Sequence, residues 1–270
     1  MNERYEFLSP LAEGGLGTVF KARDRQLGRE VAIKRIRADQ AGNVGTSVDA
    51  LIREAGHQSV LQHPNIVAVH EAGVDDEGGF IVMELVPGET LEDVLSRGAL
   101  NVADFDALVR QALAGLEAAH AAGIIHHDLK PENLMLTRLP AGGVQVKLLD
   151  FGLATTVQEG GDHQNTLHGS VYFMAPEQFE RAGVDVRTDL YALGCVFYYA
   201  LTRQHPFDGE TKPQVVVAHR YHRVASLAAL RPDLAANLVH WVEWLINRQP
   251  ADRPASAAAA LHAYETGAWA

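Results

Sequence analysis

Four polar side chains lie at a spacing that could support acid–base and metal chemistry. Asp128 and Asn133 are five positions apart (133 minus 128), with Lys130 between them. Asp150 follows a predicted strand at residues 144–149. Oxygen ligands from carboxylate and amide groups, completed by phosphates, are those Mg²⁺ prefers, so we expect Asn133 and Asp150 to hold it. Asp128 would accept a hydroxyl proton, and Lys130 would neutralise charge on a phosphoryl group in transfer. The alternative, a polar surface loop, is disfavoured by the ordered set.

A glycine-rich segment lies earlier in the chain, between two predicted strands. Residues 11–19 read LAEGGLGTV and include Gly14, Gly15 and Gly17. Glycine has no Cβ, so backbone N–H groups there can approach phosphate oxygens closely. On its own, such a segment is more often a hairpin turn.

Lys34 and Glu54 add weight to the phosphate interpretation. Lys34 ends the apolar run Val31-Ala32-Ile33, and Glu54 lies on the next predicted helix. A lysine that holds phosphates needs a carboxylate to fix its long, flexible stem. The alternative is an exposed strand lysine and an exposed helix glutamate with no mutual contact.

The elements that must position these residues change in type along the chain. The first eighty or so residues predict mainly strands, at 31–36 and 80–86, with one helix at 47–62 that ends before His63-Pro64. After Pro87-Gly88 the pattern becomes mostly helical. The expected helices there span 105–122, 190–201, 238–246 and 255–264. The helix at 190–201 is almost wholly apolar, so we expect it to be buried.

Length and composition exclude several classes of protein. A chain of 270 residues suits one large domain or two lobes that share a cleft. The net charge of −11 argues against nucleic acid or an anionic membrane as the main partner. Cys195 is the single cysteine, so no intrachain disulfide can form, and a reducing, cytoplasmic setting is expected. The apolar run at 191–201 is too short to span a bilayer, and we expect no signal peptide, because residues 1–5 lead straight into a charged, strand-like segment.

Further motifs complete an ordered set. Asp150 begins Asp-Phe-Gly, residues 175–177 read Ala-Pro-Glu, and residues 247–254 read NRQPADRP. With these motifs the chain resembles a eukaryotic-type protein kinase domain, and more narrowly the bacterial serine/threonine kinases, from Tyr5 to about Tyr264. The resemblance implies an α+β fold with two lobes: a mainly β N-lobe with one key helix (about 1–83), a hinge (about 84–88) and a mainly α C-lobe (about 89–270).

The resemblance also implies a site for ATP and Mg²⁺. Residues 14–19 would cover the phosphates, Lys34 would contact the α- and β-phosphates, and Glu54 would pair with Lys34. Asp128 would be the catalytic aspartate. Met83 would lie at the back of the adenine pocket, while Glu84 and Val86 would offer backbone groups to adenine. The pocket walls would be formed by Leu11, Val19, Ala32, Met135 and Leu149, each of which could otherwise be a core residue.

Other implied roles concern structure and substrate. Glu177 should pair with Arg253 between C-lobe helices, and Asp189 should hold the backbone of the catalytic loop. Lys130 and Ser170 match the serine/threonine class, so the substrate would be a protein Ser or Thr hydroxyl. His126 would have a packing and hydrogen-bond role.

Three positions depart from the family pattern. Ala12 replaces the first glycine of the phosphate loop, a change of one methyl group. Gln58 occupies a position that is usually apolar, where it could loosen the helix or simply expose its amide. His127 replaces the arginine that grips a phosphate on the activation segment, and histidine cannot form a bidentate fork.

Alternative functions remain at this point. A pseudokinase scaffold that binds ATP is disfavoured by the intact Lys34, Asp128, Asn133 and Asp150, and a small-molecule kinase is disfavoured by Ala175-Pro176-Glu177. A zinc site among the histidines lacks tight ligand spacing. Regulation by a partner, by self-association into a homodimer, or by parts outside this chain stays open, as does the identity of the protein substrate.

The His127 departure generates a first prediction. We expect phosphorylation of Thr155, Thr156 or Thr166 not to be the main activating event. A variant with all three changed to alanine should keep the rate of phosphoryl transfer within about five-fold of the parent. The reason is that position 127 has no arginine that could bind a phosphate on these threonines. Near-complete loss of transfer in that variant would contradict the hypothesis.

Overall fold

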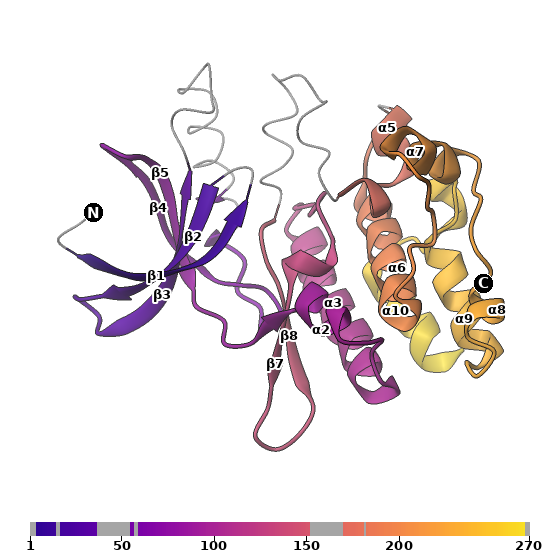
Figure 1. Ribbon diagram of the computed structural model, residues 1–270, viewed down its shortest axis with the longest axis horizontal. Coiled ribbons are helices and arrows are strands. Elements are labelled where there is room, and N and C mark those ends of the chain that lie inside the picture. The colour runs from indigo at the N-terminus through magenta and orange to yellow at the C-terminus, as the bar shows by residue number, and fades with distance from the viewer. Residues whose placement is uncertain are drawn as a thin grey trace.

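The computed structural model describes residues 4–14, 17–36, 55–56, 59–151, 170–180 and 182–267. It confirms the two-lobed α+β fold, with a sheet-rich lobe and a helical lobe on either side of a small central sheet (Figure 1). Among the described residues, no helix has both the length and the apolar character needed to cross a membrane.

The N-lobe is built on a five-stranded antiparallel sheet with the order β1-β2-β3-β5-β4. Its strands are β1 (Tyr5–Gly14), β2 (Gly17–Asp24), β3 (Arg29–Ile36), β4 (Val69–Asp75) and β5 (Gly78–Glu84). Val31 and Ile33 pack on one face of the sheet, whereas Ala32 packs on the other with Met83. This alternation places the predicted pocket residue Ala32 on the face toward the C-lobe.

One predicted strand of this lobe has different bounds in the structure, and one predicted helix falls largely outside the described residues. The strand expected at 80–86 begins at Gly78 and ends at Glu84. The helix expected at 47–62 falls largely outside the described residues, and Leu61 and Gln62 are not helical.

The C-lobe begins with a three-stranded sheet in the order β6-β7-β8: β6 (Glu89–Thr90), β7 (Leu134–Arg138) and β8 (Val144–Leu148). Its helices are α2 (Leu91–Ser96), α3 (Val102–Ala121), α5 (Pro176–Glu180), α6 (Val186–Thr202), α7 (Lys212–Arg220), α8 (Leu227–Leu230), α9 (Ala236–Leu245) and α10 (Ala257–Thr266). Short 3₁₀ turns are η2 (Pro131–Asn133), η3 (Ser170–Tyr172) and η4 (Pro250–Asp252).

Helix α6 is the centre of this lobe, as its apolar sequence predicts. Asp185 and Thr188 form a capping box at its start, which satisfies free backbone N–H groups. Nearly all of its side chains are buried. A Cβ added at Gly194 would lie 2.7 Å from Leu245 Cβ, so the absence of a side chain lets α9 approach closely. Cys195 is buried on this helix, and burial raises the pKa of its thiol.

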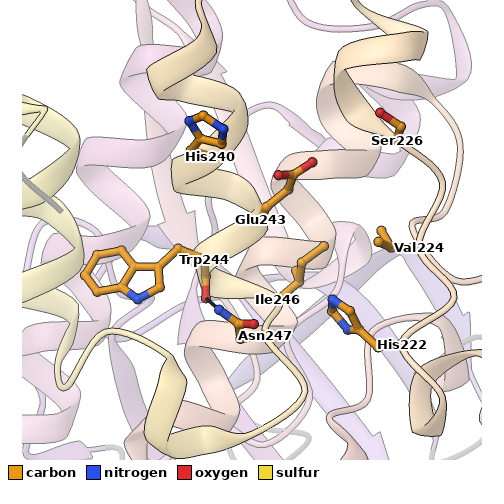
Figure 2. Close-up of a pocket in the computed structure, with 8 residues that line it drawn as sticks. All are labelled: His222, Val224, Ser226, His240, Glu243, Trp244, Ile246 and Asn247. Carbon is orange, nitrogen blue, oxygen red and sulfur yellow. Dashed lines mark hydrogen bonds between the residues drawn. The ribbon is translucent and has the colours of Figure 1, made fainter. Parts of the chain in front are cut away.

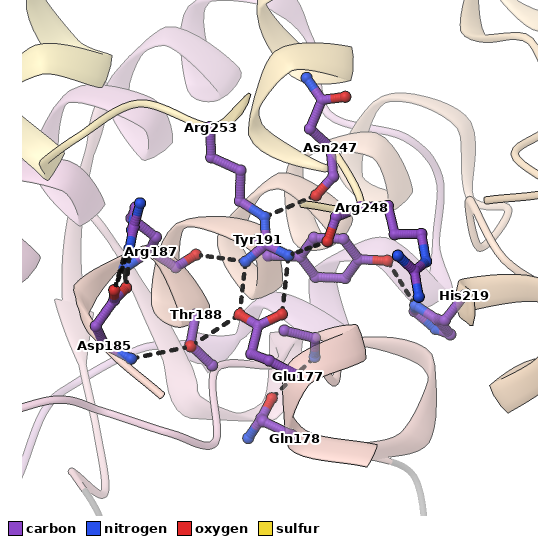
Figure 3. A network of polar contacts seen from close by, with 11 residues as sticks. Glu177, Gln178, Asp185, Arg187, Thr188, Tyr191, His219, Asn247, Arg248 and Arg253 are labelled. Carbon is purple, nitrogen blue, oxygen red and sulfur yellow. Dashed lines mark hydrogen bonds and ion pairs between the residues drawn. The ribbon is translucent and has the colours of Figure 1, made fainter. Parts of the chain in front are cut away.

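The predicted pair between Glu177 and Arg253 is confirmed, and it joins α5 to the segment before α10 (Figure 3). Two Arg253 nitrogens lie 2.6 and 2.9 Å from the two Glu177 carboxylate oxygens. The side chains are 0% and 5% exposed. Thr188 Oγ1 donates to Glu177 over 2.9 Å, and the guanidinium lies 4.6 Å from the centre of the Tyr191 ring. The pair is therefore bidentate, buried and bonded on several sides.

Removing one member of this pair should destabilise the protein strongly. Glu177→Ala leaves a buried guanidinium without its counter-ion, so we expect a loss of about 3–5 kcal/mol in the free energy of unfolding. Urea unfolding of the purified chain measures it. The control is Glu89→Ala, which breaks a pair with Arg97 whose members are 53% and 57% exposed; that change should cost at most about 1 kcal/mol. Similar small losses for both variants would contradict a structural role for the buried pair.

Candidate active site

The predicted site residues meet where the two lobes face each other. Lys34 comes from β3 of the N-lobe, and Asp150 follows β8 of the C-lobe. Lys34 Nζ lies 2.7 Å from Asp150 Oδ2, and both side chains are mostly buried. This ion pair joins residues 116 positions apart in the chain. The structure thus brings together the predicted phosphate lysine and the predicted metal ligand.

The catalytic-loop residues form a second cluster of direct contacts. Lys130 Nζ lies 2.7 Å from Asp128 Oδ2. Asn133 Nδ2 donates to the Asp128 carbonyl oxygen over 2.7 Å and approaches Asp128 Oδ2 at 3.2 Å. The expected plain loop contains the 3₁₀ turn η2, which begins at Pro131 and closes with a bond from Asn133 N to Lys130 O. Proline favours the start of such a turn because it has no N–H to leave unsatisfied.

Asp189 holds the backbone of this loop from the first turn of α6, as predicted. Its carboxylate accepts from His126 N over 2.8 Å and from His127 N over 2.9 Å. His120 Nε2 lies 2.8 Å from the same carboxylate. His127 has φ = 64°, in the left-handed region that non-glycine residues seldom adopt. The bonds to Asp189 therefore stabilise a conformation that the loop would not adopt readily by itself.

His126 connects the loop to the strand end that carries Asp150. Its Nε2 lies 2.8 Å from the Leu149 carbonyl oxygen, and its ring packs on Phe151 with 4.5 Å between centroids. Leu149 N donates to Asn133 O over 2.9 Å. These contacts fix Asp150 next to the catalytic loop, and they support the packing and hydrogen-bond role expected for His126.

The surroundings perturb the pKa of two groups in this network. Burial alone would raise the pKa of Asp189, but the bonds from His120 and the loop backbone and the nearby histidine charge lower it overall. The carboxylate is thus kept in its accepting form. Burial lowers the pKa of His127, with Asp189 opposing and His126 reinforcing the shift. The imidazole at position 127 is therefore neutral at pH 7.

An apolar cluster between the lobes contains most of the predicted adenine-pocket residues. Ala32 and Met83 are paired across β3 and β5, and Val19, Val86 and Leu149 pack against the same cluster. Glu84 N donates to the Ala68 carbonyl oxygen over 2.9 Å, so this N–H is not available to a ligand.

Two other predicted wall residues do not pack into this cluster. Leu11 is 50% exposed, and Met135 is partly buried on β7. Their adenine contacts stay predictions.

Some predicted residues are described in part or not at all. Gly14 and Gly17 face each other at the end of the β1–β2 hairpin, where Gly17 has φ = 151°. Gly15, Glu54 and Gln58 lie outside the described residues, as do Thr155, Thr156 and Thr166. The backbone of Ser170 begins η3, directly after the undescribed part of the activation segment.

The donor set fits a magnesium ion that is completed by phosphate. Asn133 uses Nδ2 for its bonds to Asp128, which leaves Oδ1 for a metal ion. Asp150 uses Oδ2 for Lys34, which leaves Oδ1. Within the described ranges, no group of three or more His, Cys, Asp or Glu side chains is arranged to hold a metal ion. Two hard oxygens alone bind Mg²⁺ weakly, so phosphate oxygens would have to supply the rest.

A pocket of about 490 Å³ lies elsewhere, on the C-lobe between α9 and residues 222–226 (Figure 2). It is lined by His222, Val224, Ser226, His240, Glu243, Trp244, Ile246 and Asn247. None of these residues belongs to the predicted site. Chemistry and contacts therefore identify the site better than the size of this hollow does.

Sequence reasoning missed two contacts in the site. The direct pairing of Lys34 with Asp150 was not expected, because Lys34 was assigned a helix glutamate as its partner. His120 was not expected to reach Asp189. Its position near the end of α3 offered only a weak signal, a polar residue in an otherwise Ala/Leu-rich helix.

The lowered pKa of Asp189 predicts how stability depends on pH. Asp189→Asn should lower the free energy of unfolding by about 3 kcal/mol at pH 7. The variant replaces a buried, charged carboxylate that contacts His120 and two backbone N–H groups with a neutral amide. The folded pKa lies below the unfolded value of about 3.9, so the stabilisation is complete above that value and is lost as the pH falls further. Urea unfolding from pH 3 to 8 should show a constant gap between parent and variant above about pH 5 and a shrinking gap below about pH 4. A gap that grows on acidification would contradict this assignment.

Comparisons with known proteins agree with this geometry. The family model described as the protein kinase domain matches residues 5–265. A probable serine/threonine-protein kinase of Clostridium perfringens is 35% identical over 255 residues, which cover 94% of this chain and 36% of that protein. Serine/threonine-protein kinase PrkC of Bacillus subtilis is 34% identical over 265 residues, covering 97% of this chain and 39% of that protein.

A solved structure extends the likeness to three dimensions. The crystal structure of Rad53 1-466 in complex with AMP-PNP has a TM-score of 0.81 and 27% sequence identity, covering 96% of this chain and 64% of that one. The chain spans less than half the length of the curated relatives given above. It belongs to the protein kinase domain family, and its relatives include bacterial serine/threonine-protein kinases.

Proposed function

We propose that this chain transfers the γ-phosphoryl group of ATP to a serine or threonine hydroxyl of a protein. The observation that carries the proposal is the convergence of Lys34, Asp150 and the catalytic loop between the two lobes. Lys34 and Asp150 are in contact at 2.7 Å, and the loop is bonded through Leu149 to the strand end that carries Asp150. A surface loop or a purely structural domain would not require this set.

Asp128 would act as the catalytic base. Its carboxylate is partly exposed, so a substrate hydroxyl could approach it. Asn133 Nδ2 and Lys130 Nζ fix its orientation by direct bonds. Positioning of this kind, rather than covalent chemistry, supplies most of the rate enhancement in phosphoryl transfer.

Lys130 and Lys34 would supply the positive charge. Lys130 lies beside Asp128, where it could neutralise charge that develops on the transferring group. Lys34 is largely buried and would hold the α- and β-phosphates. The apolar cluster that contains Ala32, Met83 and Leu149 would exclude water from the adenine side of the site.

Asn133 and Asp150 would hold Mg²⁺ through the oxygens that their present bonds leave over. When bound, the ion would neutralise negative charge on the nucleotide phosphates. Asp150 has φ = 51°, and its pairing with Lys34 keeps the carboxylate directed toward β3 of the N-lobe.

The substrate class rests on Lys130 and Ser170, which both match the serine/threonine class. The curated relatives are named serine/threonine kinases, which supports the same class for this chain. The neutral imidazole of His127 supports a form of regulation in which activity does not depend on binding a phosphate at this position.

The proposal is tested by measuring the rate at which the parent and its variants transfer phosphate from Mg-ATP to a generic protein acceptor. Asp128→Asn should lower kcat by about 10²- to 10⁴-fold, because an amide cannot accept the proton. Lys34→Met should also lose transfer. Its matched control is Lys21→Met, which removes another strand lysine of the N-lobe, paired with Glu30 at the surface. Full activity in Asp128→Asn, or ATP binding by the parent without any turnover, would contradict the proposal and favour a pseudokinase.

A further inference from the structure

His205 lies in the loop that follows α6, and its ring lies between the rings of two tyrosines from other elements. Its centroid is 4.0 Å from that of Tyr172, with 16° between the planes, and 4.7 Å from that of Tyr199, with 3° between the planes. Phe173 meets the same imidazole edge-on at 5.5 Å. Three rings are therefore stacked in order, Tyr172 on His205 on Tyr199, with a fourth closing one edge.

The outer rings of this stack belong to elements with different tasks. Tyr172 ends η3, two positions after Ser170, on the segment that we expect to face the acceptor hydroxyl. Tyr199 lies in the last turns of α6, and its hydroxyl donates to Glu92 Oε1 on α2 over 3.4 Å. His205 thus connects the substrate-side segment to the central helix of the lobe.

Helix α6 fixes both sides of the proposed site. Asp189 near its start holds the catalytic loop, and Tyr199, ten residues later, supports the stack. Ten residues of helix span about 15 Å. Through this helix the stack sets where residues 170–173 lie relative to Asp128.

The chemistry of the stack suits a fixed contact. Burial lowers the pKa of His205, and the charge of Asp208 opposes that shift only in part, so the imidazole is a neutral aromatic ring at pH 7. Aromatic pairs at these separations shift an equilibrium by about two- to ten-fold each, beyond the effect of buried area. Two such pairs on one ring are enough to favour a single position of the segment.

We propose that His205 is a positioning residue for the protein substrate, which holds residues 170–173 in the conformation that accepts it. The proposal rests on the proposed function, since it assigns the segment to the acceptor side of that reaction. It makes His205 act through Tyr172, with no contact to ATP and no part in proton transfer.

Steady-state kinetics with separate titration of protein substrate and ATP tests this role. His205→Ala should raise KM for the protein substrate about five- to twenty-fold, because both stacked pairs and the edge-on contact with Phe173 are lost. KM for ATP and kcat should stay within about two-fold. His205→Phe keeps the aromatic ring and should restore KM for the protein to within about three-fold of the parent. The matched control is His240→Ala, an exposed histidine on α9 that should change neither constant.

An unchanged KM for the protein substrate in His205→Ala would overturn the proposal, and so would a His205→Phe variant as impaired as His205→Ala. If His205→Ala fails to fold, Tyr172→Leu removes one of the two pairs and leaves His205 on Tyr199; it should raise the same KM.

Hydrogen exchange on residues 170–175 tests the placement without any need for activity. His205→Ala should speed exchange in this segment by about two- to ten-fold, with α9 unchanged. If exchange becomes faster but the parent chain transfers no phosphate, His205 does hold residues 170–173 in place, and the proposed function is wrong. Unchanged exchange at 170–175 would sink the role of His205 whatever the activity.

Discussion

The buried carboxylate of Asp189 is the interaction on which the rest of the site depends. It accepts from two successive backbone N–H groups of the catalytic loop, and His120 adds a third contact. One of those N–H groups belongs to His127, whose backbone lies in a left-handed conformation. Without a fixed acceptor at this place the loop would relax, and Asp128 would no longer be held where it meets Lys130 and Asn133. The first turn of α6 therefore holds the backbone of the loop.

The lobes are joined by charge as well as by packing. Lys34 of the N-lobe pairs with Asp150 of the C-lobe, and an apolar cluster contains residues from β3 and β5 together with Leu149. Farther down, Glu177 and Arg253 join α5 to the end of the lobe, with Thr188 of α6 bonded to the same carboxylate. Each buried charge has a close partner, as burial in a low-dielectric interior requires. Helix α6 contacts the Glu177–Arg253 pair through Thr188 and Tyr191.

Part of this could be predicted from the sequence. The buried helix followed from an almost wholly apolar run, which is a local pattern, whereas the pairing of Glu177 with Arg253 followed from the resemblance to the protein kinase family. What local patterns could not show were contacts set by packing between distant segments, such as Lys34 with Asp150, His120 with Asp189, and the stack around His205. Strand β4 was missed because its sequence, VHEAGVD, is polar and half-exposed at the edge of the sheet. Beside Leu11 the pairing of β1 with β2 shifts register between Pro10 and Ala12, so simple alternation does not fix its face.

We propose that Lys34, Asn133 and Asp150 form one site for Mg-ATP beside the catalytic loop that Asp189 holds. A crystal structure of the chain with Mg²⁺ and a non-hydrolysable ATP analogue tests this proposal most directly. We expect a metal ion bound by the free oxygens of Asn133 and Asp150, phosphates within reach of Lys34, and adenine against Ala32 and Leu149. A nucleotide bound elsewhere, or a metal ion that touches neither Asn133 nor Asp150, would contradict it.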